Sequence, residues 1–137
     1  MANSLSVRIT EDGRRNAIVT LVGQVDSADM NVIRAIPITD FTNNEVRMQL
    51  KGFKLKRVSY SITPDLVVLL AWNSNSPQPM CALSGSSEMD RRPEGGFVPN
   101  LQASGYEGSI NLSTEGFVAG RSYGFTLGLS MTKMYSP

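Results

Sequence analysis

Hydrophobic and polar residues alternate with a period of two along most of the chain, which is typical of β-strands that bury one face. The longest such run covers residues 122–133. Its apolar set is Tyr123, Phe125, Leu127, Leu129 and Met131, and its intervening set is Ser122, Gly124, Thr126, Gly128, Ser130 and Thr132. This segment is therefore predicted to form a strand whose first set faces the core and whose second set faces outward.

Shorter runs of the same kind predict seven further strands, at residues 4–10, 17–25, 32–38, 53–62, 66–72, 80–83 and 110–113. Two of these runs are apolar on both faces. In residues 17–25 the side chains of Ile18 and Val22 lie opposite the main apolar set, and residues 66–72 are apolar throughout. Both runs are therefore predicted to be covered on two sides.

The alternation slips once, within residues 53–62. Phe53 and Leu55 share one parity, whereas Val58, Tyr60 and Ile62 share the other. One extra residue in the strand would return both sets to the same face, which is what a β-bulge does. The sequence thus predicts a bulge or kink at Lys56-Arg57.

No segment keeps a helical period, and the chain has no internal repeat. A chain of 137 residues fits one domain and can bury a substantial core. We therefore expect residues 1–137 to form a single all-β domain. About eight strands with turns between them predict an antiparallel two-sheet sandwich that is jelly-roll-like.

Composition narrows the function classes. The formal net charge is only +1, which argues against a generally basic nucleic-acid-binding chain. The local basic group Lys51, Lys54, Lys56 and Arg57 is better explained as a solvated strand face than as a nucleic-acid site. The N-terminal residues lack the pattern of a signal peptide, and residues 66–72 are too short to span a membrane. We expect the chain to fold in a cytoplasm.

The residues also argue against an enzyme. The chain has no histidine, so it cannot form a Ser-His-Asp or Cys-His system or a histidine metal site. Asp26 and Asp29 fit a turn better than a catalytic or calcium-binding pair, although paired carboxylates for glycosidic cleavage stay an alternative. Cys81 fits a small buried hydrophobe. No cofactor or metal is predicted.

The connection between residues 85 and 109 is long for a compact domain, which is typical of a functional or mobile segment. It contains the densest charges of the chain, beside two apolar side chains that could anchor a partner. Alternating acids and arginines can pair across a subunit boundary, and the alternative is a mobile surface loop. The candidate contact residues here are Glu88, Met89, Asp90, Arg91, Arg92 and Phe97.

The outward set of residues 122–133 supplies two more candidates. Gly124 and Gly128 would allow a neighbouring backbone to approach closely, and the hydroxyls between them could form hydrogen bonds. An oligomer could use this face; an ordinary solvent-facing strand surface is the alternative.

Three segments resemble small virion proteins of tailed bacteriophages, notably marine and cyanobacterial ones. The segments are residues 67–73 (VVLLAWN), residues 105–116 (GYEGSINLSTEG) and residues 123–129 (YGFTLGL). The resemblance extends over most of the chain, from Val7 to Lys133. Such virion proteins are similar to capsid decoration (cement or knob) proteins. The resemblance implies a compact β module, favours a homotrimer, and implies a position on the outside of the head, bound to the major capsid protein.

Two other functions stay open from the sequence. One is a minor tail, fibre or head-completion component. The other is a carbohydrate-binding β-sandwich module, in which Trp72 and the tyrosines would stack on sugars, although Trp72 lies in a strand predicted to be buried.

Overall fold

The computed structural model describes residues 3–30, 33–41, 49–76, 78–100 and 102–136. Within these residues the chain forms nine strands and two short 3₁₀ helices. The strands are β1 (Ser4–Asp12), β2 (Asn16–Val25), β3 (Ile33–Ile36), β4 (Gln49–Ile62), β5 (Val67–Trp72), β6 (Gln78–Leu83), β7 (Ser86–Asp90), β8 (Ile110–Glu115) and β9 (Tyr123–Ser136). The 3₁₀ helices are η1 (Ile38–Asp40) and η2 (Arg92–Glu94).

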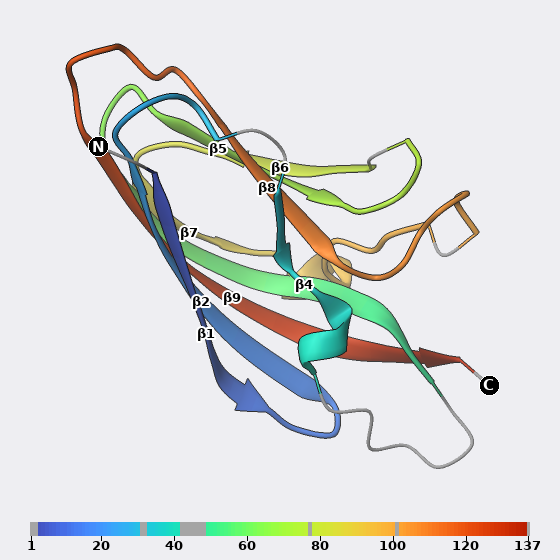
Figure 1. Ribbon diagram of the computed structural model, residues 1–137. Helices are drawn as coiled ribbons and strands as arrows, with labels where there is room; N and C mark the ends of the chain where they lie inside the picture. Colours follow the sequence, from blue (N-terminus) through green and yellow to red (C-terminus); the bar gives the residue numbers. More distant parts are fainter. Residues whose placement is uncertain (1–2, 31–32, 42–48, 77, 101, 137) are drawn as a thin grey trace.

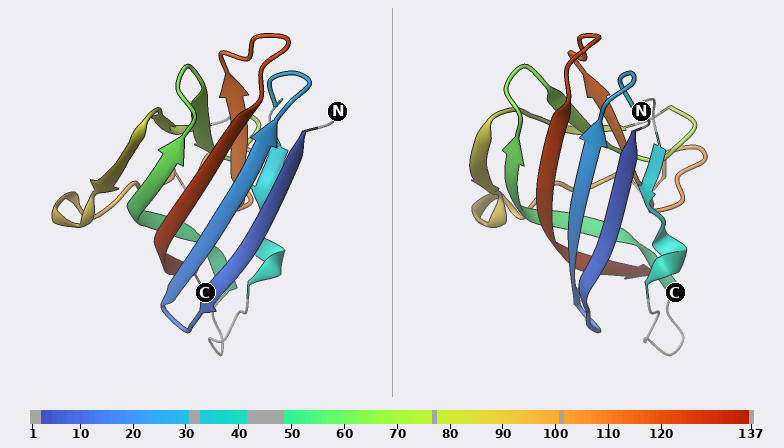
Figure 2. Two further views of the ribbon diagram at one scale, coloured as in Figure 1. Left: turned by 90° about the vertical axis from the view of Figure 1, so that its left-hand side faces the viewer. Right: turned by 60° about the vertical axis from the view of Figure 1, so that its left-hand side comes forward.

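The strands form two antiparallel sheets that face each other (Figure 1). The five-stranded sheet has the order β1-β2-β9-β4-β7, and the four-stranded sheet has the order β3-β8-β5-β6. The pairs β2–β9, β3–β8, β4–β7 and β5–β6 are nested, as if one long hairpin had been rolled into two layers. This is the jelly-roll arrangement, so the predicted fold class is confirmed. β1 extends the larger sheet by one strand beyond it (Figure 2).

The core lies between the sheets, and β9 contributes to it as its alternation predicts. Tyr123, Phe125, Leu127, Leu129 and Met131 are all at most 2% exposed. β9 lies between β2 and β4, so its apolar side chains have neighbours on both sides in the same sheet. The inward residues of both sheets belong to one contiguous hydrophobic cluster.

The predicted bulge in β4 is confirmed. The pairing of β4 with β9 shifts between Leu55 and Arg57, which leaves Lys56 as the extra residue. Phe53 and Leu55 on one side of the shift, and Val58 and Ile62 on the other, are all buried. The bulge therefore returns two sets of opposite parity to the same core.

Three expectations about the strands are wrong. First, β2 is buried on one face only, since Ile18 is 37% and Val22 is 49% exposed on the other. Second, β5 is fully buried on one face only, because its residues alternate between buried and half-buried. A run of apolar residues therefore did not require two covered faces. Third, residues 85–109 were expected to be a connection without a strand, but they contain β7, which pairs with β4 from Arg57 to Ser61.

No helix in the described part of the chain has the length and hydropathy needed to cross a membrane.

Candidate functional site

A furrow runs along the outer face of the five-stranded sheet, over β9. Four adjacent hollows follow this strand, and each shares one β9 residue with the next: Thr126, then Gly128, then Ser130. The largest hollow, at the start of β9, has a volume of ≈ 770 Å³. The furrow is therefore continuous along the strand. The left-hand view of Figure 2 looks onto this face, with β9 between β4 and β2.

The floor is low because the outward residues of β9 are glycine, serine and threonine, whereas those of β2 are mostly larger. On the β2 side the wall consists of Ile18, Thr20, Val22 and Gln24, and on the β4 side it includes Arg57, Ser59 and Ser61. The furrow thus combines hydroxyl groups with two exposed aliphatic side chains. The alternation places Ile18 and Val22 on the outward face of β2, but their apolar character predicts that this face is buried. The structure shows instead that both side chains are exposed.

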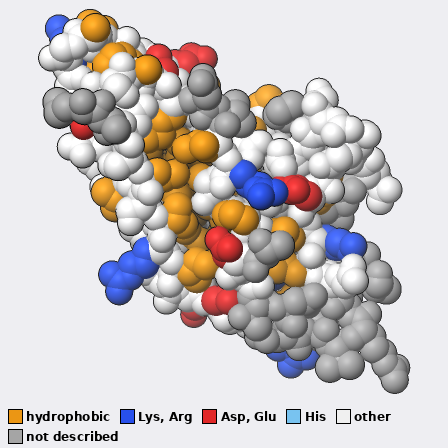
Figure 3. Space-filling view, viewed as in Figure 1, with side chains coloured by type: hydrophobic (Ala, Val, Ile, Leu, Met, Phe, Trp, Pro, Cys, Tyr) orange, Lys and Arg blue, Asp and Glu red, His pale blue; other side chains and the backbone are white. Residues whose placement is uncertain are grey.

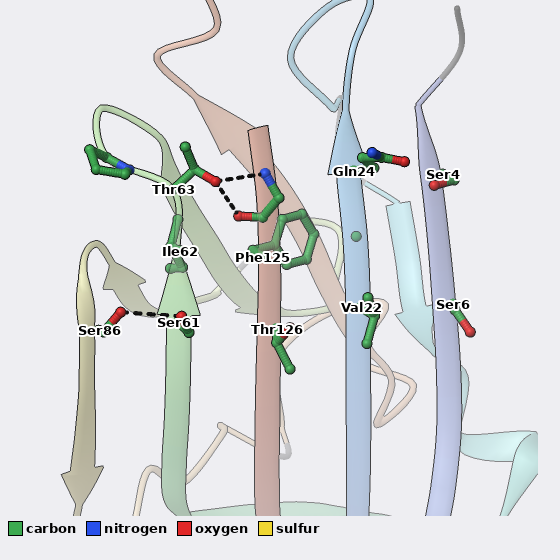
Figure 4. A pocket seen from close by; sticks show the side chains of 13 residues that line it. Ser4, Ser6, Val22, Gln24, Ser61, Ile62, Thr63, Ser86, Phe125 and Thr126 are labelled. Carbon is green, nitrogen blue, oxygen red and sulfur yellow. Dashed lines mark hydrogen bonds between the residues drawn. The ribbon is translucent and has the colours of Figure 1, made fainter. Parts of the chain in front are cut away.

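At the start of β9, one threonine, Thr63, connects the turn after β4 to the furrow floor (Figure 4). The Thr63 hydroxyl accepts a hydrogen bond from the Gly124 N–H (2.9 Å) and donates one to the Gly124 carbonyl (3.0 Å). The Thr63 N–H also donates to that carbonyl (2.9 Å). Beside it, Ser86 of β7 donates to Ser61 of β4 (3.2 Å). The β4–β5 turn is therefore attached directly to the furrow floor.

The two candidate glycines both lie on this floor, but their surroundings differ. A Cβ atom on Gly124 would have its nearest neighbours at 3.8 Å and 4.0 Å, which is ordinary contact. A Cβ atom on Gly128 would lie 2.8 Å from the Ser59 Oγ, so that hydroxyl would have to move. The structure brings both predicted glycines into one surface, as the small-residue face of the sequence indicated.

The charged candidates lie at the side of this surface and pair within the chain. Glu88 of β7 accepts a hydrogen bond from Arg57 of β4. The Asp90 carboxylate accepts from the Arg92 Nε (2.9 Å) and Nη2 (2.6 Å), and these bonds lower the pKa of Asp90 to about 2. Glu88, Asp90 and Arg92, which were expected to pair across a subunit boundary, therefore already have partners in the same chain.

The apolar candidates of this segment are half-buried and have contacts within the chain, and their expected role as anchors for a partner stays a prediction. Met89 and Phe97 both pack against the core cluster. Phe97 also forms a β-bridge with Leu55, with N···O distances of 2.9 Å and 3.1 Å. The Arg91 guanidinium lies over the Phe97 ring, 5.2 Å from its centre. These contacts attach the segment to β4.

The aspartates of the predicted turn have structural partners. Asp29 accepts hydrogen bonds from the Phe117 N–H (3.0 Å) and the Thr114 hydroxyl (3.3 Å). Asp26 accepts from the Ser122 hydroxyl (2.6 Å). Both carboxylates thus connect the turn after β2 to the region between β8 and β9. In the ranges that the structure describes, no three His, Cys, Asp or Glu side chains are grouped so that they could hold a metal ion.

Cys81 is half-buried, and burial raises the pKa of its thiol to about 11, although Arg91 opposes this effect. The thiol therefore stays protonated at neutral pH, which fits its expected role as a small hydrophobe and not as a nucleophile.

All ten aromatic side chains lie in the described ranges, and all are buried or half-buried. Trp72 is 2% exposed, so its predicted burial is confirmed. Phe125 and Tyr60 are among the residues that line the furrow, but Phe125 is 2% exposed and Tyr60 is half-buried. The exposed side chains there are hydroxyl, amide, aliphatic and charged groups. Sugar-binding sites commonly stack a ring on an exposed aromatic face, and the furrow offers no such platform.

Comparison with known proteins adds one structural likeness. No protein-family model matches the chain, and no curated protein matches it. A solved structure described as "CBM4 structure and function" aligns over 95% of this chain and 94% of that chain, with 7% sequence identity and a TM-score of 0.34. A TM-score this low establishes neither a shared function nor a close relationship.

Proposed function

We propose that this chain is a non-enzymatic structural protein of a phage particle, which binds the outside of the capsid and stabilises it. The furrow on the five-stranded sheet is the observation that carries the proposal. The phage context comes from the resemblance of residues 67–73, 105–116 and 123–129 to virion proteins. The jelly roll supports it further, because viral capsid domains commonly use this architecture.

The chemistry of the furrow suits a segment of the major capsid protein. Gly124 and Gly128 leave room for a neighbouring backbone, and the hydroxyls beside them can pair with its N–H and C=O groups. Ile18 and Val22 supply apolar contact on one wall. A protein segment uses all three features together, whereas a sugar would lack an aromatic partner here.

Each contact of this kind would be weak, and many copies would act together on one shell. Binding of one copy to two or more capsid subunits, or of an oligomer to several, raises the effective concentration of the second contact. The homotrimer implied by the resemblance is one such oligomer and stays a prediction. Stabilisation of the head would then follow from cross-linking neighbouring subunits.

Pelleting with purified phage heads tests the proposal. Labelled full-length chain is mixed with heads of the parent phage from which the protein has been removed, and bound copies per head are counted. Saturation at hundreds of copies is the expected result. A few copies per particle would instead assign the chain to the tail, a fibre or head completion, and no binding would contradict a virion role.

A matched pair of variants locates the surface. Thr126→Arg places a bulky cation on the exposed furrow floor and should reduce the apparent affinity for heads at least about tenfold. Ser113→Arg, on the outer face of β8 in the opposite sheet, should bind as the wild type does. Equal binding by both variants would exclude the furrow as the contact.

A carbohydrate-binding module stays the second candidate, since lectin domains also use jelly rolls. A glycan array decides between them. Specific binding of a sugar, lost in Thr126→Arg and kept in Ser113→Arg, would replace the capsid proposal.

A further inference from the structure

β1 is the least protected of the four sheet edges. β7 has only five residues and carries Glu88 and Asp90; β3 has four residues and a register shift; β6 contains Pro79 at a register shift. Short length, charge, proline and irregular register all discourage a further strand from pairing. β1 has nine residues; its acids Glu11 and Asp12 follow a register shift, but residues 4–9 pair with β2 in unbroken register and carry only one charge, Arg8. Its outer edge therefore presents a regular row of backbone N–H and C=O groups.

The apolar side chains of β1 are also incompletely covered. Leu5, Val7 and Ile9 lie opposite core-facing positions of β2, yet Val7 is 39% exposed and the other two are half-buried. The reason is the unequal size of the sheets, since the larger sheet extends one strand beyond the smaller. Ile33, on the neighbouring edge strand β3, is likewise 39% exposed. Figure 3 shows hydrophobic side chains gathered in a band on this side of the sandwich.

The strand is held in place for pairing. At its start, the Asn3 side chain accepts hydrogen bonds from the N–H groups of Asp26 and Ser27 (2.9 Å and 3.1 Å) and donates to the Ala28 carbonyl (2.7 Å). At its end, the register shift between Ile9 and Glu11 terminates the regular segment. The edge is therefore a preformed, regularly paired segment of six residues.

The sequence of this segment is self-complementary. If two copies of β1 pair antiparallel about Val7, Leu5 lies opposite Ile9 of the partner subunit, Ser6 lies opposite Arg8 of the partner subunit, and Val7 meets its own copy. Apolar residues then face apolar residues on the inner side. No two like charges are directly opposite, which avoids the arrangement that most destabilises a strand pair.

We propose that two copies of the chain associate through β1, which joins their five-stranded sheets across a two-fold axis. The β1 strand of the second copy thereby supplies hydrogen-bond partners for the open backbone edge and covers the exposed apolar band. Such an isologous contact pairs copies two by two, so the assembly contains an even number of copies, unlike a lone trimer. The proposal does not depend on the furrow or on a phage particle.

Sedimentation equilibrium of the full chain over a range of concentrations tests the assembly. The expected mass is twice that of the chain, or a higher even multiple. Val7→Lys should raise the dissociation constant at least about tenfold, because two lysines would meet at the axis. Val118→Lys is the control: the same change at a 50% exposed position outside both β1 and the furrow should leave the mass unchanged.

A cysteine variant tests the register and remains informative if Val7→Lys folds poorly. Opposed residues of an antiparallel pair have Cα atoms about 4.5–5.5 Å apart, within the range that a disulfide bridges. Val7→Cys should therefore form a covalent dimer under mild oxidation, whereas Val118→Cys and the wild type, with Cys81 alone, should not. A monomeric or trimeric wild type would overturn the proposal. So would a dimer that persists in the Val7→Lys variant and is not cross-linked in the Val7→Cys variant.

Discussion

The inner and outer faces of the five-stranded sheet are built from the same strands but obey different constraints. Inward residues of β9 are large and almost fully buried, and each fills a defined space against the opposite sheet. Outward residues of the same strand are small, and their spaces are open. The inner face therefore determines whether the chain folds, and the outer face is free to serve recognition. Four predictions test this contrast, in decreasing order of expected effect.

Deleting Lys56 should have the largest effect, because it removes the bulge that connects two inward sets of opposite parity. Without it, either Phe53 and Leu55 or Val58 and Ile62 would turn to the outer face. We expect no cooperative thermal unfolding and little soluble protein. Lys56→Ala is the control: it keeps the residue count and loses the hydrogen bond from the Lys56 Nζ to the Gly95 carbonyl (3.1 Å). A deletion variant that melts like the wild type would show that the register is not fixed by the core.

Truncating a single inward side chain should cost less. Phe125 is 2% exposed, so Phe125→Ala should lower the free energy of unfolding by roughly 3–5 kcal/mol, as large-to-small core substitutions do. Val22→Ala, on the outer face of the neighbouring strand, should change it by about 0.5 kcal/mol or less. Urea denaturation measures both values. Similar losses for the two variants would mean that the outer face is also packed.

Two glycines allow the same comparison with the smallest chemical change. A Cβ atom on Gly23 would lie 2.1 Å from the Phe125 ring, whereas one on Gly124 would have its nearest neighbour at 3.8 Å. Gly23→Ala should therefore destabilise by about 1–3 kcal/mol through overpacking. Gly124→Ala should stay within about 0.5 kcal/mol of the wild type. The reverse order in thermal melts would contradict the assignment of the faces.

Cys81, on β6 of the four-stranded sheet, gives the fourth test, and its expected effect on stability near neutral pH is small. Burial raises the thiol pKa from 9.0 to about 11. The folded thiol therefore keeps its proton between these values while the unfolded thiol loses it, so this group favours unfolding as the pH rises above 9. A thiol reagent at pH 8 should react much more slowly with the native chain than with the chain in urea. Equal rates would show that the thiol is not shielded.

Much of the fold follows from the residues because period-two alternation and the position of turns are local properties. The strand of residues 122–133, the bulge at Lys56-Arg57 and the two-sheet jelly roll were all predictable in this way. The candidate glycines were predictable too, since they belong to the outward set of that strand. The charged and apolar candidates near residue 90 were not, because charge density alone does not reveal that Asp90 pairs with Arg92 or that Phe97 bridges to Leu55.

The sequence by itself determined which residues share a face, but only the tertiary structure decided which faces are covered. Ile18 and Val22 have the right parity for a second buried surface, yet they are exposed because the chain folds only one layer against β2. β1 alternates like the other strands, yet Val7 is exposed because the opposite sheet is one strand narrower. Covering depends on the number and order of strands in each sheet, which is a property of long-range pairing that alternation within one strand does not encode.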